Sequence, residues 1–366
     1  MPAALVLVVN AGSSSLKLRL LDGADELVES ADLPADAGGF DTEAVGSAIA
    51  GWPRPDLVGH RVVHGGTTFS GAVVIDDSVR SSLSALTDLA PLHQPKSLAG
   101  LDAVSVALPD VPAVACFDTA FHATMSAAAT TYAVPAAWRE RWGVRRYGFH
   151  GLSHAYASRR AVELCGLPVA NTRVVTCHLG AGASLCAVVD GRSVDTTMGF
   201  TPLEGLVMAT RSGSVDPGLV LWLEEHEQLS PHEVATALEQ RSGLFALTGT
   251  ADLRTIEQRA DAGDADAVLA VDVYVHRLVT SIAAMAAAAG GLDVVVFTGG
   301  VGEHSSAVRA AAARRLSWLG LGVDASANAG AEPDVEITAP GATVRTLVIT
   351  AREDLQIARE ARAAAG

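Results

Sequence analysis

The chain has 366 residues, with 41 acidic against 26 basic side chains and a formal charge of −15. This length exceeds one ordinary hydrophobic core, so two domains are expected. The negative charge argues against a surface that binds nucleic acid or an anionic membrane. The first long apolar run, Ala3 to Val9, is too short to span a membrane and lacks a basic leader. We therefore expect a cytoplasmic protein.

The cysteines are consistent with that location. Cys116, Cys165, Cys177 and Cys186 lie in apolar surroundings without the spacing of metal ligands. We expect reduced thiols in the core.

Leu5 to Gly23, LVLVVNAGSSSLKLRLLDG, has two apolar runs that flank a turn of small polar residues. The pattern predicts a strand, a turn and a second strand. Such a turn presents several backbone N–H groups, Gly12 allows a ligand to approach closely, and Lys17 adds a positive charge. This composition suits a phosphate, although an ordinary hairpin turn has it too.

The pattern returns in Arg173 to Gly191, RVVTCHLGAGASLCAVVDG, where Val174 aligns with Val6 and Gly180 with Gly12. Two halves that each open with a strand, a glycine turn and a strand indicate a duplicated domain. Two facing turns can hold a polyphosphate from both sides.

Two charged residues stand out in the first half. Arg61 lies in LVGHRVV (57–63), a strand of the buried type, where an arginine normally meets a carboxylate or a phosphate. It is either a ligand for an anion or part of a structural ion pair. Asp118 follows the strand Val111 to Cys116, at the end of a strand where ligands often bind, and could equally cap a helix.

Two segments lack any helical or strand period. Arg145 to His154, RRYGFHGLSH, places His150 between an aromatic residue and a glycine before a helix that starts near Ser153. Asp195 to Pro217 is apolar, rich in small residues and holds Arg211. Long structureless segments in a compact domain are typical of binding loops.

Val294 to Thr298 predicts a buried strand that runs into GGVGEH (299–304), with a helix from about Ser305. A strand, a glycine turn and a helix N-terminus form a nucleotide site, because the free N–H groups face the ligand. The spacing matches neither a dinucleotide fingerprint nor a P-loop. Glu353, at the start of the closing helix, is either a favourable first-turn acid or a metal ligand.

The remaining periodicity predicts further elements. A strand is expected at 344–349, with a third strand of the first sheet near 26–30. Helices are expected over 42–50, 78–88, 97–107, 217–225, 231–241 and 264–289.

In order, the motifs are NAGSSSLK, HRVVHGG, FDTAFH, YGFHGLSH, HLGAGAS, DTTMGFTPLEGL, TRSG, FTGGVGEH and REDLQIAR. From Val8 to about Arg359 the chain resembles the acetate kinase family, within the superfamily of actin, sugar kinases and chaperone ATPases. The resemblance implies an α/β fold of two duplicated actin-like ATPase (ribonuclease H-like) domains with an active-site cleft between them. The N-terminal domain would comprise 1–119 plus 355–366, with a boundary within 119–150, and the C-terminal domain 120–354.

The resemblance also implies a reaction. The family transfers the γ-phosphoryl group of ATP to acetate by direct in-line displacement, giving acetyl phosphate and ADP, with Mg²⁺ or Mn²⁺, as a homodimer. A kinase for propionate or butyrate differs only in its pocket, where a methylene contributes roughly 1–3 kcal/mol to discrimination. A non-catalytic nucleotide-switch protein of the superfamily is the third alternative.

Carried over by position, the resemblance assigns residues to four roles. Asn10 and Glu353 would hold the metal, and Asp118, His150 and Arg211 would be catalytic. Arg61 would bind the substrate carboxylate, with Val63, Leu92, Phe149 and Pro202 around its methyl group. ATP would contact Lys17, His178, Leu179, Gly180, Ala181, Gly182, Asp252, Leu253, Arg254, Gly300, Val301, Gly302, Glu303 and His304.

Three positions depart from the family pattern. Ala181 stands where the family has an asparagine, and Gln94 and His304 stand where asparagine is common. These changes bear on the strength of ATP binding rather than on the reaction. Because a carboxylic acid is ionised at neutral pH, no strong base is needed, and Asp118 is expected to position the metal or waters.

Overall fold

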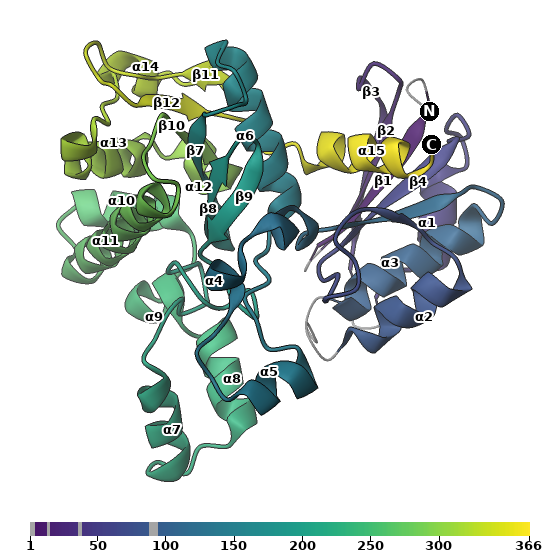
Figure 1. Ribbon diagram of the computed structural model, residues 1–366, viewed down its shortest axis with the longest axis horizontal. Coiled ribbons are helices and arrows are strands. Elements are labelled where there is room, and N and C mark those ends of the chain that lie inside the picture. The colour runs from purple at the N-terminus through teal and green to yellow at the C-terminus, as the bar shows by residue number, and fades with distance from the viewer. Residues whose placement is uncertain (1–3, 13–14, 36–38, 88–93) are drawn as a thin grey trace. The chain divides into compact units, whose positions relative to one another are not determined.

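The computed structural model describes residues 4–12, 15–35, 39–87 and 94–366 (Figure 1). The chain forms two compact units. Unit 1 comprises Met1–Ala123, Phe149–Tyr156 and Arg352–Gly366, and unit 2 comprises Thr124–Gly148 and Ala157–Ala351. Leu92, expected in the pocket for the methyl group, lies outside the described residues.

Unit 1 is built on a six-stranded sheet in the order β3-β2-β1-β4-β6-β5. Its central strands β1, β4 and β6 run parallel, whereas β2, β3 and β5 are antiparallel to their neighbours. The strands are β1 (Val6–Ala11), β2 (Ser15–Leu21), β3 (Leu27–Pro34), β4 (Leu57–Val62), β5 (Val73–Val74) and β6 (Ala113–Phe117).

Both faces of this sheet are covered. On one face Val6 and Val8 pack with Ile357 of α15, and on the other Leu7 and Val9 pack with residues of α1 and α3. This alternation follows from the two-residue period of a strand. The helices of unit 1 are α1 (Thr42–Ile49), α2 (Asp77–Ala85), α3 (Gln94–Ala107) and α15 (Glu353–Ala364), with the 3₁₀ turn η2 (Ala120–Thr124).

Unit 2 repeats the same sheet. Its strands follow the order β9-β8-β7-β10-β12-β11, and each neighbouring pair has the same relative direction as its counterpart in unit 1. The duplication predicted from the two glycine turns is thus present in the topology. The strands are β7 (Arg173–Leu179), β8 (Ala183–Val189), β9 (Arg192–Thr196), β10 (Val294–Thr298), β11 (Val335–Glu336) and β12 (Arg345–Val348).

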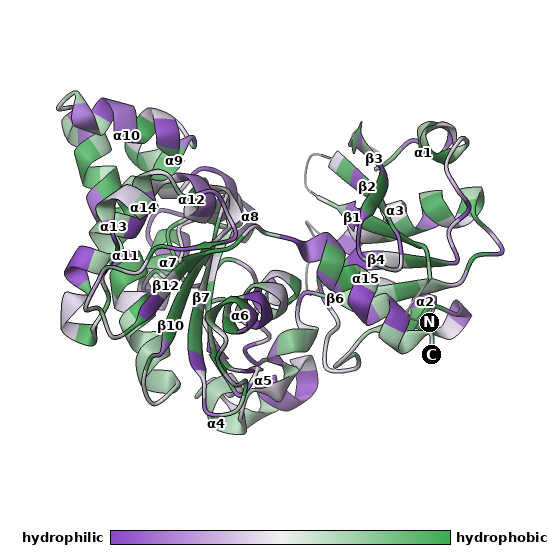
Figure 2. Cartoon of the chain, turned by 90° about the horizontal axis from the view of Figure 1, so that it is seen from above, coloured by the Kyte–Doolittle hydropathy of each residue, from purple (hydrophilic) through white to green (hydrophobic). Residues whose placement is uncertain are grey.

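Helices surround the second sheet. In Figure 2 the green of hydrophobic residues is concentrated on central strands such as β10, whose five residues are all buried. The helices that belong mainly to unit 2 are α4 (Ala127–Thr130), α5 (Ala136–Trp142), α6 (Gly151–Cys165, which begins in unit 1), α7 (Pro217–Glu225), α8 (Pro231–Gln240), α9 (Gly243–Thr248), α10 (Leu253–Asp261), α11 (Ala265–Ala288), α12 (Gly299–His304), α13 (Ser306–Arg315) and α14 (Ala325–Ala329), with the 3₁₀ turn η3 (Ser317–Leu319).

Among the described residues, α11 is the one helix that is long and apolar enough to cross a membrane. Core helices of soluble proteins can have the same length and composition. Helix α11 packs on β7 and β8, with Tyr274, Leu278 and Ile282 among its buried residues.

The helix expected from about Ser305 is confirmed as α13, which begins at Ser306. The glycine turn itself is helical, forming α12 from Gly299, and Ser305 then caps α13. The Glu303 carboxylate accepts a hydrogen bond from the Gly299 N–H at 2.9 Å. That contact stabilises a first turn that its glycines alone disfavour.

Candidate active site

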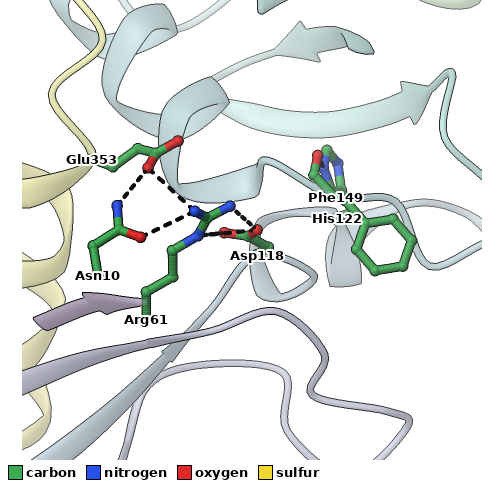
Figure 3. Close-up of polar contacts among 6 residues, drawn as sticks. All are labelled: Asn10, Arg61, Asp118, His122, Phe149 and Glu353. Atoms are coloured by element: carbon green, nitrogen blue, oxygen red, sulfur yellow. Dashed lines mark hydrogen bonds and ion pairs between the residues drawn. The ribbon is translucent and has the colours of Figure 1, made fainter. Parts of the chain in front are cut away.

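A half-buried arginine organises the candidate site of unit 1. Arg61 of β4 pairs in register with Cys116 of the parallel strand β6, so Asp118 follows just beyond the end of β6. Arg61 Nε donates to Asp118 Oδ1 at 3.0 Å, and Nη2 donates to Oδ2 at 2.6 Å (Figure 3). This two-point contact is the strong form of an arginine–carboxylate pair.

Two further side chains contact the same guanidinium. Arg61 Nη1 donates to Asn10 Oδ1 at 3.1 Å and lies 3.7 Å from Glu353 Oε2. Asn10 Nδ2 in turn donates to Glu353 Oε2 at 3.0 Å. Two carboxylates therefore surround one positive charge (Figure 3).

Electrostatics keep Arg61 charged. Burial would lower the pKa of Arg61, but the charges of Asp118 and Glu353 outweigh it and raise the pKa above its ordinary value. Burial raises the pKa of the Asp118 carboxyl, and the charge of Arg61 opposes that rise. Arg61 thus forms a structural ion pair, and it still has donors that are not bound to Asp118 and could bind an anion.

The donor set next to Arg61 suits a hard cation. Asn10 and Glu353 offer an amide oxygen and a carboxylate within one hydrogen-bonded cluster. Mg²⁺ is usually held by one or two carboxylates, water and substrate phosphates. Among the described residues, no group of three or more His, Cys, Asp and Glu side chains is arranged to hold a metal ion. Asn10 and Glu353 therefore fit a metal that takes most of its ligands from elsewhere.

The residue that follows His150 contacts Asp118. The Gly151 N–H donates to the Asp118 carbonyl at 2.8 Å, and a side chain at Gly151 would place its Cβ 2.2 Å from that oxygen. His150 itself has φ +56°, whereas the other described non-glycine residues with positive φ are Asp, Asn or Gln. A positive φ is uncommon for any residue other than glycine, and such backbone conformations cluster at functional sites.

Two of the residues expected around the substrate methyl group are buried in unit 1. Val63 is 5% exposed and Phe149 is 1% exposed. The Phe149 ring meets His64 edge-on at 5.5 Å between centroids, and its carbonyl accepts from His122 Nε2 at 3.0 Å. The remaining described member, Pro202, belongs to unit 2.

In unit 2, residues 197–216 form no helix or strand, as the sequence predicts. Arg211 Nη1 donates to the Pro202 carbonyl at 2.8 Å, and Arg211 has no ion pair with any residue that the structure describes. Burial lowers the pKa of Arg211, and the charge of Glu239 opposes that effect. Most of the Arg211 donors are thus available for an anion.

The expected nucleotide contacts of the second sheet come from one edge. Thr298 pairs with His178 in the parallel strands β10 and β7, so the turn at 180–182 and helix α12 begin side by side. The Ala181 carbonyl accepts from the Ala209 N–H at 3.1 Å, which links the turn to the loop that carries Arg211. Leu179 is fully buried, so only its backbone can reach a ligand.

The other expected ATP contacts differ in what their side chains do. Asp252 caps α10 by accepting from the Arg254 N–H at 3.1 Å. The Glu303 carboxylate accepts from the N–H groups of Gly299 and Ala351, both at 2.9 Å. Its side chain therefore shapes the turn, so the expected contact of Glu303 with ATP would have to come from its backbone. Lys17 is an exposed residue of β2 in unit 1.

Sequence reasoning did not name Asp118 as the partner of Arg61, because periodicity does not specify that β4 pairs with β6. It also missed Glu204, which binds Arg146 and Tyr132. The one acid in TPLEGL (201–206), within a loop that has no helical or strand period, was the signal that could have identified it.

A model of the acetokinase family matches residues 53–359. The chain belongs to the acetokinase family. It is 44% identical to the acetate kinase of Leifsonia xyli subsp. xyli over 97% of this chain and 98% of that protein. The crystal structure of Porphyromonas gingivalis acetate kinase covers all of both chains with a TM-score of 0.91 at 36% identity. A propionate kinase from Francisella tularensis gives 0.91 at 34% identity, over 98% and 99% of the two chains.

Acetokinase family membership confirms the resemblance carried by the motifs. The α/β class with two duplicated actin-like domains is confirmed by the solved structures of the family and by the repeated strand order.

Proposed function

We propose that this acetokinase-family chain is an acetate kinase, which transfers the γ-phosphoryl group of ATP to acetate and gives acetyl phosphate and ADP. The observation that carries the proposal is the setting of Arg211. It is a half-buried cation without an ion pair among the described residues, on a loop whose Ala209 N–H donates to the Ala181 carbonyl of the turn at 180–182. Such a cation suits the charge that spreads over a transferring phosphoryl group.

The proposed mechanism is one in-line displacement. An oxygen of the ionised carboxylate attacks the γ-phosphorus, and the bond from that phosphorus to the β–γ bridging oxygen breaks with its electron pair leaving on ADP. Arg61 binds the carboxylate through donors that Asp118 does not occupy. Arg211 and His150 stabilise the equatorial oxygens. Asp118 orients Arg61 and takes no proton.

We also propose that Mg²⁺, with Mn²⁺ as an alternative, binds at Asn10 and Glu353, which supply oxygen ligands of the right chemistry. Such an ion neutralises phosphate charge when bound. The functional domains are proposed to be 1–119 with 355–366 and 120–354. A cytoplasmic homodimer is proposed from the family resemblance, and light scattering after gel filtration tests the dimer.

A second substrate has support from one relative. The Francisella tularensis protein similar to this chain is a propionate kinase. Val63 and Phe149 are apolar and buried in unit 1, and apolar pockets discriminate weakly between acids that differ by one methylene. Propionate, and with it butyrate, therefore remains the alternative acceptor.

Phosphoryl transfer from MgATP to acetate, propionate and butyrate, measured in parallel as acyl phosphate formed, tests the proposal. ATP hydrolysis without any acid is the control. We expect the highest kcat/KM with acetate. A higher kcat/KM with propionate or butyrate would replace the acceptor, and hydrolysis without acyl phosphate would indicate a nucleotide-switch protein.

A further inference from the structure

The loop at 197–216 needs support from outside itself, because no helix or strand fixes its backbone. Two side chains of unit 2 outside the loop, Arg146 and Tyr132, supply it by binding Glu204 of the loop. Arg146 Nη2 donates to Glu204 Oε1 at 2.6 Å, and the Tyr132 hydroxyl donates to Glu204 Oε2 at 2.5 Å. Each oxygen of the Glu204 carboxylate therefore has its own partner.

The same two partners also grip the start of the loop. Arg146 Nη1 donates to the carbonyls of Thr197 and Met198 at 3.1 and 2.9 Å. The Tyr132 hydroxyl accepts from the Phe200 N–H at 3.1 Å. Glu204 thus closes a ring of contacts around residues 197–200.

Gly199 shows how closely the parts of this ring fit. A Cβ at this position would lie 1.8 Å from Glu204 Oε2 and 2.2 Å from the Tyr132 hydroxyl. The backbone at Gly199 therefore packs directly against the Glu204 carboxylate and the Tyr132 hydroxyl. A movement of Glu204 would change the position of this backbone.

A short path leads from Glu204 to Arg211. Glu204 lies two residues after Pro202, whose carbonyl accepts a hydrogen bond from Arg211 Nη1 at 2.8 Å. Just beyond, Gly205 and Ser214 exchange hydrogen bonds at 3.0 and 3.1 Å, which tie the two sides of the loop together. The direction of the Arg211 guanidinium is accordingly set by a segment that Glu204 anchors.

We propose that Glu204 is a positioning residue for Arg211. Its carboxylate, bound by Arg146 and Tyr132, fixes the Pro202 carbonyl and thereby aims Arg211 at the phosphoryl group in transfer. This inference rests on the proposed function. The Glu204 side chain is 37% exposed and the Arg146 side chain 17% exposed, so water weakens part of the contribution of this ion pair to folding. The contact should therefore affect catalysis much more than stability.

Glu204→Gln tests the proposal, because it keeps the shape and removes the charge. We expect kcat to fall about tenfold to a hundredfold, since small misplacements of a catalytic group have effects of this size. The KM for ATP and the melting temperature should change little. The control is Asp293→Asn, which removes a similarly exposed two-point pair with Arg173 elsewhere in unit 2. It should leave kcat near the wild-type value.

A double mutant separates positioning from any independent effect. If Glu204 acts through Arg211, Glu204→Gln added to Arg211→Ala should lower kcat no further. An additive loss, or a wild-type kcat for Glu204→Gln alone, would overturn the inference. Should Glu204→Gln fold poorly, Tyr132→Phe replaces it, and the kcat of Tyr132→Phe is measured alone and in combination with Arg211→Ala. Wild-type protein that forms no acyl phosphate would instead overturn the proposed function, and this inference with it.

Discussion

At the scale of single residues, Arg61 forms an ion pair, which is one of the two settings that the sequence left open for it. It is held by Asp118, Asn10 and Glu353 and presents only its remaining donors. Arg61→Ala should therefore raise the KM for acetate at least about tenfold, because a charge-assisted contact contributes roughly 1.5–3 kcal/mol. Steady-state kinetics at saturating MgATP measures this. Arg80→Ala, which removes a surface pair with Asp102, is the matched control, and an unchanged KM for acetate would contradict the assignment.

Arg211 should behave in the opposite way. Its charge matters most when the phosphoryl group is in transfer, so Arg211→Ala is expected to lower kcat by about 10³-fold with little change in nucleotide affinity. Arg211→Lys should recover little of this loss, because a point charge cannot replace a planar fork. Arg241→Ala, at the exposed end of α8, is the control. Near-normal kcat for Arg211→Ala would leave the 197–216 loop a purely structural element.

A substitution at Ala181 should strengthen the binding of ATP. Its side chain is exposed and supplies no amide, while its carbonyl already binds Ala209. Ala181→Asn should lower the KM for ATP by an amount equivalent to roughly 1.5–3 kcal/mol at most, the size of one hydrogen bond to a charged group. ATP titration of the initial rate is the measurement. A KM that stays constant or rises would mean that the existing turn already satisfies the phosphate.

At the scale of elements, β4 and its neighbours hold histidines in neutral form. Burial lowers the pKa of His60, His64 and His122 to about 4, although Asp102 opposes the effect at His60 and the Phe149 carbonyl opposes it at His122. The unfolded chain, with a pKa of 6.5, binds protons first as the pH falls. The stability that these groups contribute is therefore complete above pH 6.5 and is lost between pH 6.5 and 4.

The expected slope is about 1.4 kcal/mol per pH unit for each such histidine. Denaturant unfolding at several pH values between 7 and 4 measures it. His60→Leu should flatten the slope, whereas His232→Gln, which replaces an exposed histidine of α8, should not. Equal slopes for wild type and His60→Leu would show that His60 takes up no extra proton on unfolding.

Much of the element pattern was predictable, and the exceptions have physical reasons. Strands such as Val294–Thr298 are buried on both faces and read as continuous apolar runs. The start of α12 was not predictable, because glycines disfavour helix and the contact that stabilises it comes from Glu303. The two-point contact of Arg61 with Asp118 needs the pairing of β4 with β6, which sequence periodicity does not specify.

At the scale of the whole molecule, the two units are expected to take different ligands. MgADP should slow amide exchange at 178–182 and 299–304 of unit 2, and acetate should slow it at 61–64 and 149–151 of unit 1, because bound N–H groups exchange slowly. Hydrogen exchange followed by mass spectrometry measures both. Acetamide, a neutral molecule of similar size, is the control for acetate. Protection by MgADP confined to unit 1 would refute this division.

Unit 1 is discontinuous, and this has a consequence for how the protein is made. Ile357, Ala358 and Ala361 of α15 cover the face of the first sheet that carries Val6 and Val8. A ribosome synthesises β1 to β6 early, but it reaches α15 only after all of unit 2. While residues 157–351 are being synthesised, α15 is not yet present to cover this apolar face. The nascent chain offers chaperones a binding surface throughout that interval, and the unit that begins first is the last to complete its core.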